Sequence, residues 1–140
     1  MICIIRIRGQ VNLNSDVKNT LNRLRLRRKY SCVVLSPSKE LDSRIKKVRN
    51  FVAFGEIRNE VFEKLIEKRG QIWDKTKKIK IEPKKVIENI EKGKKYEDFN
   101  LKPFFRLHPP RKGINSKLHF PKGVLGDNKE KINELIERML

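Results

Sequence analysis

The sequence predicts an α/β fold in which a two-layer β-α-β-α-β core, residues 1–58, is followed by a helical extension, residues 59–140. Three short apolar runs in the first 58 residues are typical of strands, and the two segments between them repeat apolar residues at helical spacing. Two more helical patterns follow within residues 59–92. Because a β-α-β-α-β unit is close to the smallest that closes a two-layer α/β sandwich, we expect the extension to join this core in a single structural unit.

The first strand is predicted over residues 2–8, ICIIRIR, a run rich in isoleucine. Alternation along a strand would place Arg6 and Arg8 on one face and Ile5 and Ile7 on the other. The other two strands are predicted at SCVVLS, which stops before Pro37, and at FVAFGEI, residues 51–57.

Two helices are predicted between these strands. The first begins at an N-cap, either Asn14 or Ser15, and its apolar face consists of Val17, Leu21 and Leu24. The second covers residues 38–50, with an apolar face of Leu41, Ile45 and Val48.

Three helices are predicted in the extension. Asn59 is the expected cap of a short helix that ends at Gly70, and Pro83 suits the first turn of a helix stopped by Gly93. In the last helix, Asp127 and Glu130 have the spacing of a capping box. The inward-facing residues of the three helices are, in order, Phe62, Leu65 and Ile66; Val86, Ile87 and Ile90; and Ile132, Leu135, Ile136 and Met139.

The charge of the chain indicates a polyanionic partner. There are 35 Lys+Arg against 17 Asp+Glu, a formal net charge of +18, and such an imbalance destabilises the compact state by self-repulsion. Nucleic acid fits best, because each phosphate that a Lys or Arg neutralises releases a counterion. An anionic membrane fits less well, since no segment has the pattern of a basic amphipathic helix with exposed Trp and Phe. A basic protein that is merely soluble is the remaining alternative.

The cysteines and the N-terminus favour a cytosolic protein. Cys3 and Cys32 each lie in an apolar run, so we expect buried thiols, no disulfide and no metal site. The apolar start is too short for a signal peptide, and no later run approaches a membrane span. We expect no cofactor and no small-molecule substrate.

The first 58 residues contain the most concentrated basic run, RLRLRRK, residues 23–29. It joins the first predicted helix to the second strand, so Leu24 and Leu26 can face the core while the arginines point outward. Arginine suits phosphate oxygens and stacks on bases. Tyr30 could also stack on a base, although a place at the rim of the core is more common. A purely solvated face is less expected, because Asp16 is the only acid in the first 39 residues.

The second predicted helix carries Arg44, Lys46, Lys47 and Arg49 on the faces that its apolar residues leave open. A contact with a polyanion and ordinary helix solubility account equally well for these four residues.

Residues 101–123 hold six Lys+Arg and no acid, and FRLHPPRKG, residues 105–113, is their stiffest part. The two prolines fix φ and remove two backbone donors, so the segment needs little ordering when it binds. We call residues 105–123 the basic clasp. A catalytic alternative would pair His108 with His119 as acid and base for phosphodiester cleavage. Residues 101–123 supply no carboxylate to orient either imidazole, so the clasp is the favoured interpretation.

Four segments in order, RIRGQVN, FVAFGEI, RLHPPRKG and INELIERML, resemble the archaeal and eukaryotic form of large-subunit ribosomal protein L-thirty. The most specific part is RLHPPRKG followed by KLHFPKGVLG. The resemblance covers nearly the whole chain and implies a compact core with a small antiparallel, ferredoxin-like sheet. It also implies contact with large-subunit rRNA near the 5S rRNA, other ribosomal proteins as neighbours, and no catalytic role.

The sequence therefore predicts a structural rRNA-binding protein of the large ribosomal subunit in the cytoplasm. A free RNA-binding module for tRNA or small RNA, and an RNA-cleaving enzyme that uses His108 and His119, remain as alternatives. The predicted RNA-binding residues are Arg6, Arg8, Arg23, Arg25, Arg27, Arg28, Lys29, Tyr30, Arg44 and Arg49 in the core, and Arg106, His108, Arg111, Lys112, Lys117, His119 and Lys122 in the basic clasp.

Overall fold

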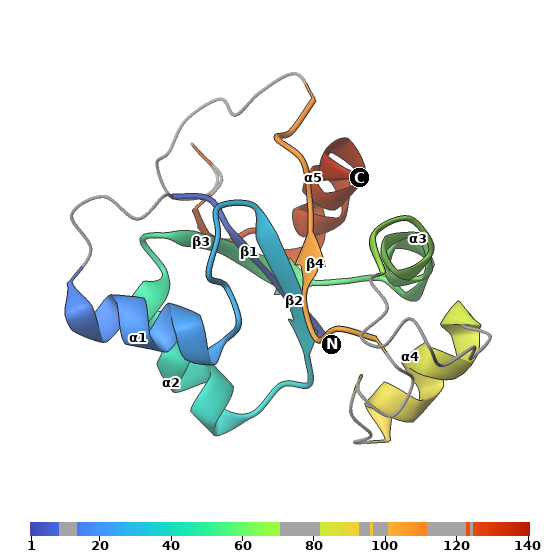
Figure 1. The fold of residues 1–140 in the computed structure, drawn as a ribbon, viewed down its shortest axis with the longest axis horizontal. Helices are drawn as coiled ribbons and strands as arrows, with labels where there is room; N and C mark the ends of the chain where they lie inside the picture. Colours follow the sequence, from blue (N-terminus) through green and yellow to red (C-terminus); the bar gives the residue numbers. More distant parts are fainter. Residues whose placement is uncertain (9–13, 71–81, 93–95, 97–100, 112–122, 124) are drawn as a thin grey trace.

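A computed structural model of the chain describes residues 1–8, 14–70, 82–92, 96, 101–111, 123 and 125–140. A five-stranded sheet in the order β4-β2-β1-β3-β5 lies between two groups of helices (Figure 1). On one side are α1 (Ser15–Arg23) and α2 (Lys39–Val48). On the other are α3 (Asn59–Arg69), α4 (Pro83–Glu91) and α5 (Ile132–Met139). The predicted α/β class is confirmed.

The centre of the sheet is β1 (Ile2–Arg6), flanked by β2 (Ser31–Leu35) and β3 (Val52–Glu56), both antiparallel to it. These are the three strands that the sequence predicts, although β1 ends at Arg6 and not at residue 8. The edges come from the extension: β4 (Phe105–Arg106) adds to β2 antiparallel, and β5 (Gly126–Asp127) adds to β3 parallel. The sequence did not predict either edge strand, because each is only two residues long.

The helices of the core begin at side-chain caps. The Asn14 side chain accepts a hydrogen bond from the backbone of Asp16, and Ser38 Oγ accepts one from the backbone of Leu41. Both helices turn their apolar residues to the same face of the sheet. That face is the α1/α2 core, whose buried members are Ile4, Leu21, Leu24, Leu26, Val33, Leu41, Ile45, Val48 and Val52.

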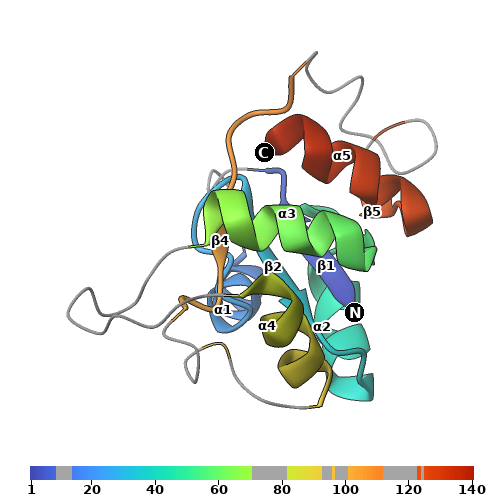
Figure 2. The same ribbon diagram turned by 90° about the vertical axis from the view of Figure 1, so that its right-hand side faces the viewer.

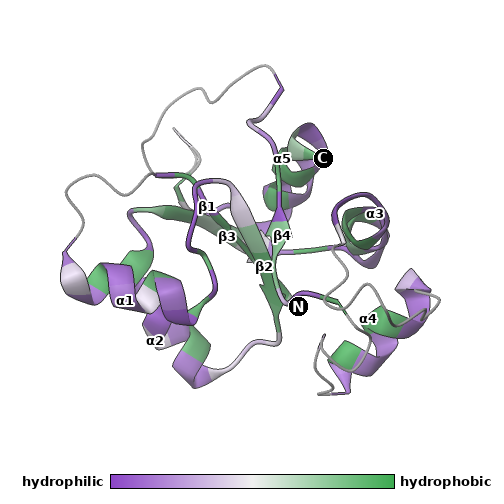
Figure 3. Cartoon of the chain, in the orientation of Figure 1, coloured by the Kyte–Doolittle hydropathy of each residue, from purple (hydrophilic) through white to green (hydrophobic). Residues whose placement is uncertain are grey.

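The opposite face of the sheet is covered by the extension (Figure 2). There Cys3, Ile5 and Ile7 of the first strand region pack in one cluster with apolar residues of α3, α4 and α5. The Tyr96 hydroxyl donates to the Val34 carbonyl oxygen at 2.7 Å, and burial raises the pKa of this phenol far above its usual range. In Figure 3 the strands and helices that contribute to the two clusters contain residues coloured as hydrophobic.

Two of the predicted helix starts are wrong. The first residue of α3 is Asn59 itself, and the preceding Arg58 backbone donates at 2.8 Å to the buried side chain of Asn133. Asp127 and Glu130 form no capping box: the Asp127 carboxylate accepts from the Lys129 backbone at 2.9 Å and starts a 3-10 turn, η2 (Lys129–Lys131), before α5. Gly93, the predicted stop of α4, lies outside the described residues.

Candidate nucleic-acid interface

The loop between α1 and β2, residues 24–30, presents a group of arginines to solvent, and we call it the arginine loop. Leu24 and Leu26 are buried in the α1/α2 core, as predicted, whereas Arg25, Arg27 and Arg28 are exposed. The backbone turns sharply: Leu26 donates to Leu21 and Arg25 donates to Asn22. The loop therefore fixes its leucines inward and turns the arginines outward.

Two non-glycine residues of this loop have positive φ, Arg25 at 63° and Tyr30 at 65°. This left-handed conformation costs an L-residue on the order of 1–2 kcal/mol, so the surrounding contacts must hold it. Tyr30 is held on both sides, since its backbone donates to Arg6 at 2.7 Å and accepts from Leu107 at 3.1 Å. Lys29 also lies over the Tyr30 ring, with Nζ 5.0 Å from the ring centre.

Arg6 does not belong to the exposed group, contrary to the prediction that it contacts RNA. It is only 2% exposed, because α1 and α2 cover the face of β1 from which it projects. Its Nη1 donates to the Leu26 carbonyl oxygen at 2.8 Å and its Nε to the Arg8 carbonyl oxygen at 3.0 Å. Burial lowers the pKa of Arg6. The buried guanidinium thus holds the arginine loop from inside.

The arginine loop meets β4 and forms a pocket of about 330 Å³, which we call the arginine pocket. Strand pairing sets Arg106 opposite Ser31 and so brings the basic clasp beside the loop. None of the lining residues is acidic, so an anion that enters the pocket meets mainly cationic side chains. The pocket is lined by Arg25, Arg27, Arg28, Ser31, Phe104 and Arg106.

Phe104 is the lining residue that the sequence did not assign to a site. The Arg106 guanidinium lies 5.6 Å from the centre of its ring, a cation–π arrangement. The alternation in PFFRL carries the missing signal: Phe105 and Leu107 face the core, so Phe104 and Arg106 must face the other side of β4.

The start of the basic clasp is docked on the end of α5. The backbone amides of His108 and Arg111 donate to the carbonyl oxygens of Met139 and Arg138, which satisfies two acceptors in the last turn of the helix. The ring of His108 is engaged as well, with Nε2 at the main-chain oxygen of Leu140 and Nδ1 at the Pro109 carbonyl oxygen. The imidazole therefore belongs to the contact that holds the start of the basic clasp against the C-terminal end of α5, and we call this contact the structural joint.

The remaining predicted residues divide into two groups. Arg8, Arg23, Arg44, Arg49 and Arg111 are exposed on the surface, outside the lining of the arginine pocket. The clasp residues that lie outside the described part of the chain are Lys112, Lys117, His119 and Lys122.

The described part of the chain contains two buried cysteines and no cluster of candidate metal ligands. No group of three or more His, Cys, Asp or Glu there could hold a metal ion. Cys3 and Cys32 are buried with free thiols, as the sequence predicts, and burial raises the pKa of Cys3 well above its usual value, which keeps this thiol protonated. None of the described helices is both long and apolar enough to cross a membrane.

Comparison of the sequence with known proteins identifies the family of the chain. Residues 2–52, from β1 to the start of β3, match the family model described as ribosomal protein L30p/L7e. Over 99% of both chains, the sequence is 38% identical to large ribosomal subunit protein uL30 of Archaeoglobus fulgidus. The chain belongs to the uL30 family. It is also 37% identical to uL30 of Pyrobaculum aerophilum, over 98% of this chain and 92% of that protein. With uL30 of Methanococcus maripaludis it shares 34% identity, over 98% and 97%.

Proposed function

We propose that the chain is a structural constituent of the large ribosomal subunit that binds large-subunit rRNA in the cytoplasm. Membership of the uL30 family supports the assignment of the chain to the large ribosomal subunit, because its relatives are named as large-subunit proteins. The arginine pocket supports the mode of binding. Four arginines converge there with no acid among the lining residues, an arrangement suited to the phosphates of a folded RNA.

The mechanism combines charge neutralisation with positioning. Arginine forks on Arg25, Arg28 and Arg106 grip phosphate oxygens, and the cation–π contact with Phe104 limits the freedom of Arg106 before RNA arrives. The other exposed basic residues of the prediction extend the footprint, whereas Arg6 is buried and the half-buried His108 ring is engaged by backbone oxygens of the protein itself. The four clasp residues outside the described part stay in the proposal on their sequence alone.

Removing two pocket arginines tests this function. With Arg28→Ala and Arg106→Ala combined, the slope of log K against log salt for binding to large-subunit rRNA should flatten by up to about 0.9 per lost phosphate contact. Filter binding over a salt series measures the slope. The matched control is Lys68→Ala with Lys84→Ala, two exposed lysines on α3 and α4, which should leave it unchanged. An equal change of slope in both double variants would show that the pocket arginines contribute only to the overall positive charge and not to a specific phosphate contact.

Sedimentation separates the alternatives. A structural constituent stays in the large-subunit peak of a sucrose gradient after a high-salt wash, whereas a free tRNA- or small-RNA-binding module sediments at the top. We propose no catalytic role, since the family is ribosomal and His108 is held in a structural joint. An RNA-cleaving enzyme would instead lose activity when His108 and His119 are both changed to Ala.

The resemblance also supports a position near the 5S rRNA. Chemical probing of 5S rRNA in large subunits assembled with and without the chain would test that position: protection that depends on the chain supports it, and an identical pattern contradicts it.

A further inference from the structure

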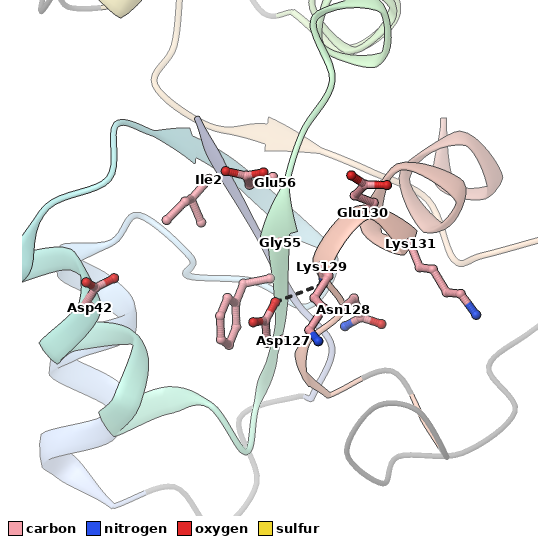
Figure 4. A pocket seen from close by; sticks show the side chains of 10 residues that line it. Ile2, Asp42, Gly55, Glu56, Asp127, Asn128, Lys129, Glu130 and Lys131 are labelled. Atoms are coloured by element: carbon pink, nitrogen blue, oxygen red, sulfur yellow. Dashed lines mark hydrogen bonds between the residues drawn. The ribbon is translucent and has the colours of Figure 1, made fainter.

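A groove of about 680 Å³ opens beside β3 and β5, at the sheet edge opposite the arginine pocket (Figure 4). Its acidic lining residues come from four separate elements: Asp42 from α2, Glu56 from β3, Asp127 from β5 and Glu130 from η2. Its apolar lining residues, Ile2 and Phe54, are partly buried and pack on the α1/α2 core. We call it the acid-lined groove.

The four carboxylates of the groove lack ion-pair partners within the described part of the protein. No lysine or arginine there makes an ion pair with any of the four, and the Asp127 carboxylate is engaged only by a backbone amide. Lys129 and Lys131 also belong to the lining, so acids outnumber bases by four to two. The side chain of Lys131 extends away from Ile2, Asp42 and Asp127 in Figure 4. In a chain of net charge +18, this concentration of acid is local and specific.

Backbone hydrogen bonds and close packing fix the shape of the groove. The Asn128 backbone donates to the Phe54 carbonyl oxygen at 2.8 Å, and its side chain donates to Gly126 at 3.1 Å, which fixes the connection between β5 and η2. The turn comes so close to β3 that a Cβ added to Gly55 would lie 2.3 Å from the Lys129 carbonyl oxygen. A ligand would therefore meet a formed groove and need not order one.

The lining selects among occupants by charge. RNA would bring phosphates against unpaired carboxylates, which is repulsive. An uncharged apolar segment would cover Ile2 and Phe54 but desolvate four acids without compensation. A segment that carries both lysine or arginine and a bulky apolar side chain satisfies the carboxylates and the apolar lining together.

We propose that the acid-lined groove is the docking site for a basic, extended segment of another ribosomal protein. Its cationic side chains lie over Asp42, Glu56 and Glu130, and one apolar side chain packs on Ile2 and Phe54. This contact is separate from rRNA binding and turns the β5 edge toward protein while the β4 edge turns toward RNA. A second copy of this chain is a different occupant, which the test distinguishes.

Site-specific photocrosslinking in assembled large subunits tests the proposal. The photoreactive residue p-benzoylphenylalanine replaces Glu130 at the groove or, as a matched control, Glu67, an exposed acid on α3. Only material in the large-subunit peak is irradiated, so a failure of the chain to assemble is seen before any crosslink is read. Mass spectrometry then identifies what is joined to each position.

The expected product at position 130, absent at position 67, is a Lys/Arg-rich segment of another ribosomal protein. Adding Asp42→Asn with Glu56→Gln should lower its yield about fivefold, since each exposed charge contributes modestly. Adding Glu88→Gln with Glu91→Gln, which removes the same charge from α4, should leave the yield unchanged. A crosslink to rRNA or to a second copy, no product above position 67, or a yield indifferent to the groove acids would each overturn the proposal.

Discussion

The two edges of the sheet carry opposite charge. At the β4 edge, four arginines surround the arginine pocket, and at the β5 edge, four carboxylates line the groove. Both open on the side of the α1/α2 core, because Phe104 and Phe54 pack against it from the two edges. A net charge of +18 is therefore not spread evenly, and the chain presents different chemistry to neighbours on its two sides.

The two edges also differ in how they are assembled. The arginine pocket combines one loop with one short strand, and a buried side chain of the central strand holds the loop. The acid-lined groove takes its acids from four elements, and the joint between β3 and α5 depends on buried Asn133. The shape of the arginine pocket depends on a loop that buried Arg6 holds by hydrogen bonds. The shape of the acid-lined groove depends on how α5, which is distant in sequence, packs against the end of β3. Changes at Arg6, Asn133 and Arg25 should separate these two constructions.

The largest effect is expected from Arg6→Ala. The change leaves a cavity and removes the donors of two backbone carbonyls, so the free energy of unfolding should fall by about 3 kcal/mol. Urea unfolding measures this, with exposed Arg23→Ala expected to cost less than about 0.5 kcal/mol.

The salt slope of rRNA binding distinguishes the two roles of Arg6. If its guanidinium holds the loop, the variant binds more weakly but keeps the slope, provided binding is measured where it is fully folded. If Arg6 contacts phosphate, the slope flattens and the stability hardly changes. That second pattern would restore the prediction made from the sequence.

Asn133→Ala should have the next largest effect, at the opposite edge. The Asn133 side chain accepts from the Arg58 backbone and donates to the carbonyl oxygens of Glu56 and Glu130, while only 2% of the residue is exposed. Its removal leaves these groups without their partner, which should cost about 2 kcal/mol in urea unfolding. Asn89→Ala is the matched control, because Asn89 bonds one exposed carbonyl in α4 and should cost less than about 0.5 kcal/mol. Equal losses of unfolding free energy in the two variants would mean that the hydrogen bonds of Asn133 do not stabilise the contact between β3 and α5.

The sequence predicts the centre of this molecule better than its edges. Strands β1 to β3 and helices α1 and α2 follow from local apolar periodicity, and the family match covers nearly the same stretch. The edge strands are two-residue pairings created by tertiary contact, so no local pattern marks them. The true partner of the α3 start, Asn133, is likewise distant in sequence.

The candidate sites follow the same rule. The basic residues of the arginine loop follow one another in one short run, so the sequence alone reveals them. The acid-lined groove takes single acids from elements that are distant in sequence. Arg6 was misplaced because alternation shows which residues share a face but not whether helices cover that face. The sequence could not show that the His108 ring bonds the end of the chain beyond α5, because that contact depends on the fold.

The smallest effect is expected at Arg25, where charge and backbone conformation can be separated. Both Arg25→Ala and Arg25→Gly remove a cation from the arginine pocket, so both should flatten the salt slope of rRNA binding by the same amount. Only glycine adopts the observed φ of 63° without strain, so the glycine variant should exceed the alanine variant in unfolding free energy by about 1 kcal/mol.

Equal stability of these two variants would show that the free protein does not hold the left-handed turn at Arg25. The loop would then take its shape from RNA, and the β4 edge would not be preformed as the β5 edge is. A stability difference with equal salt slopes would instead show that the protein holds the strained turn before RNA binds, with Arg6 as its internal anchor.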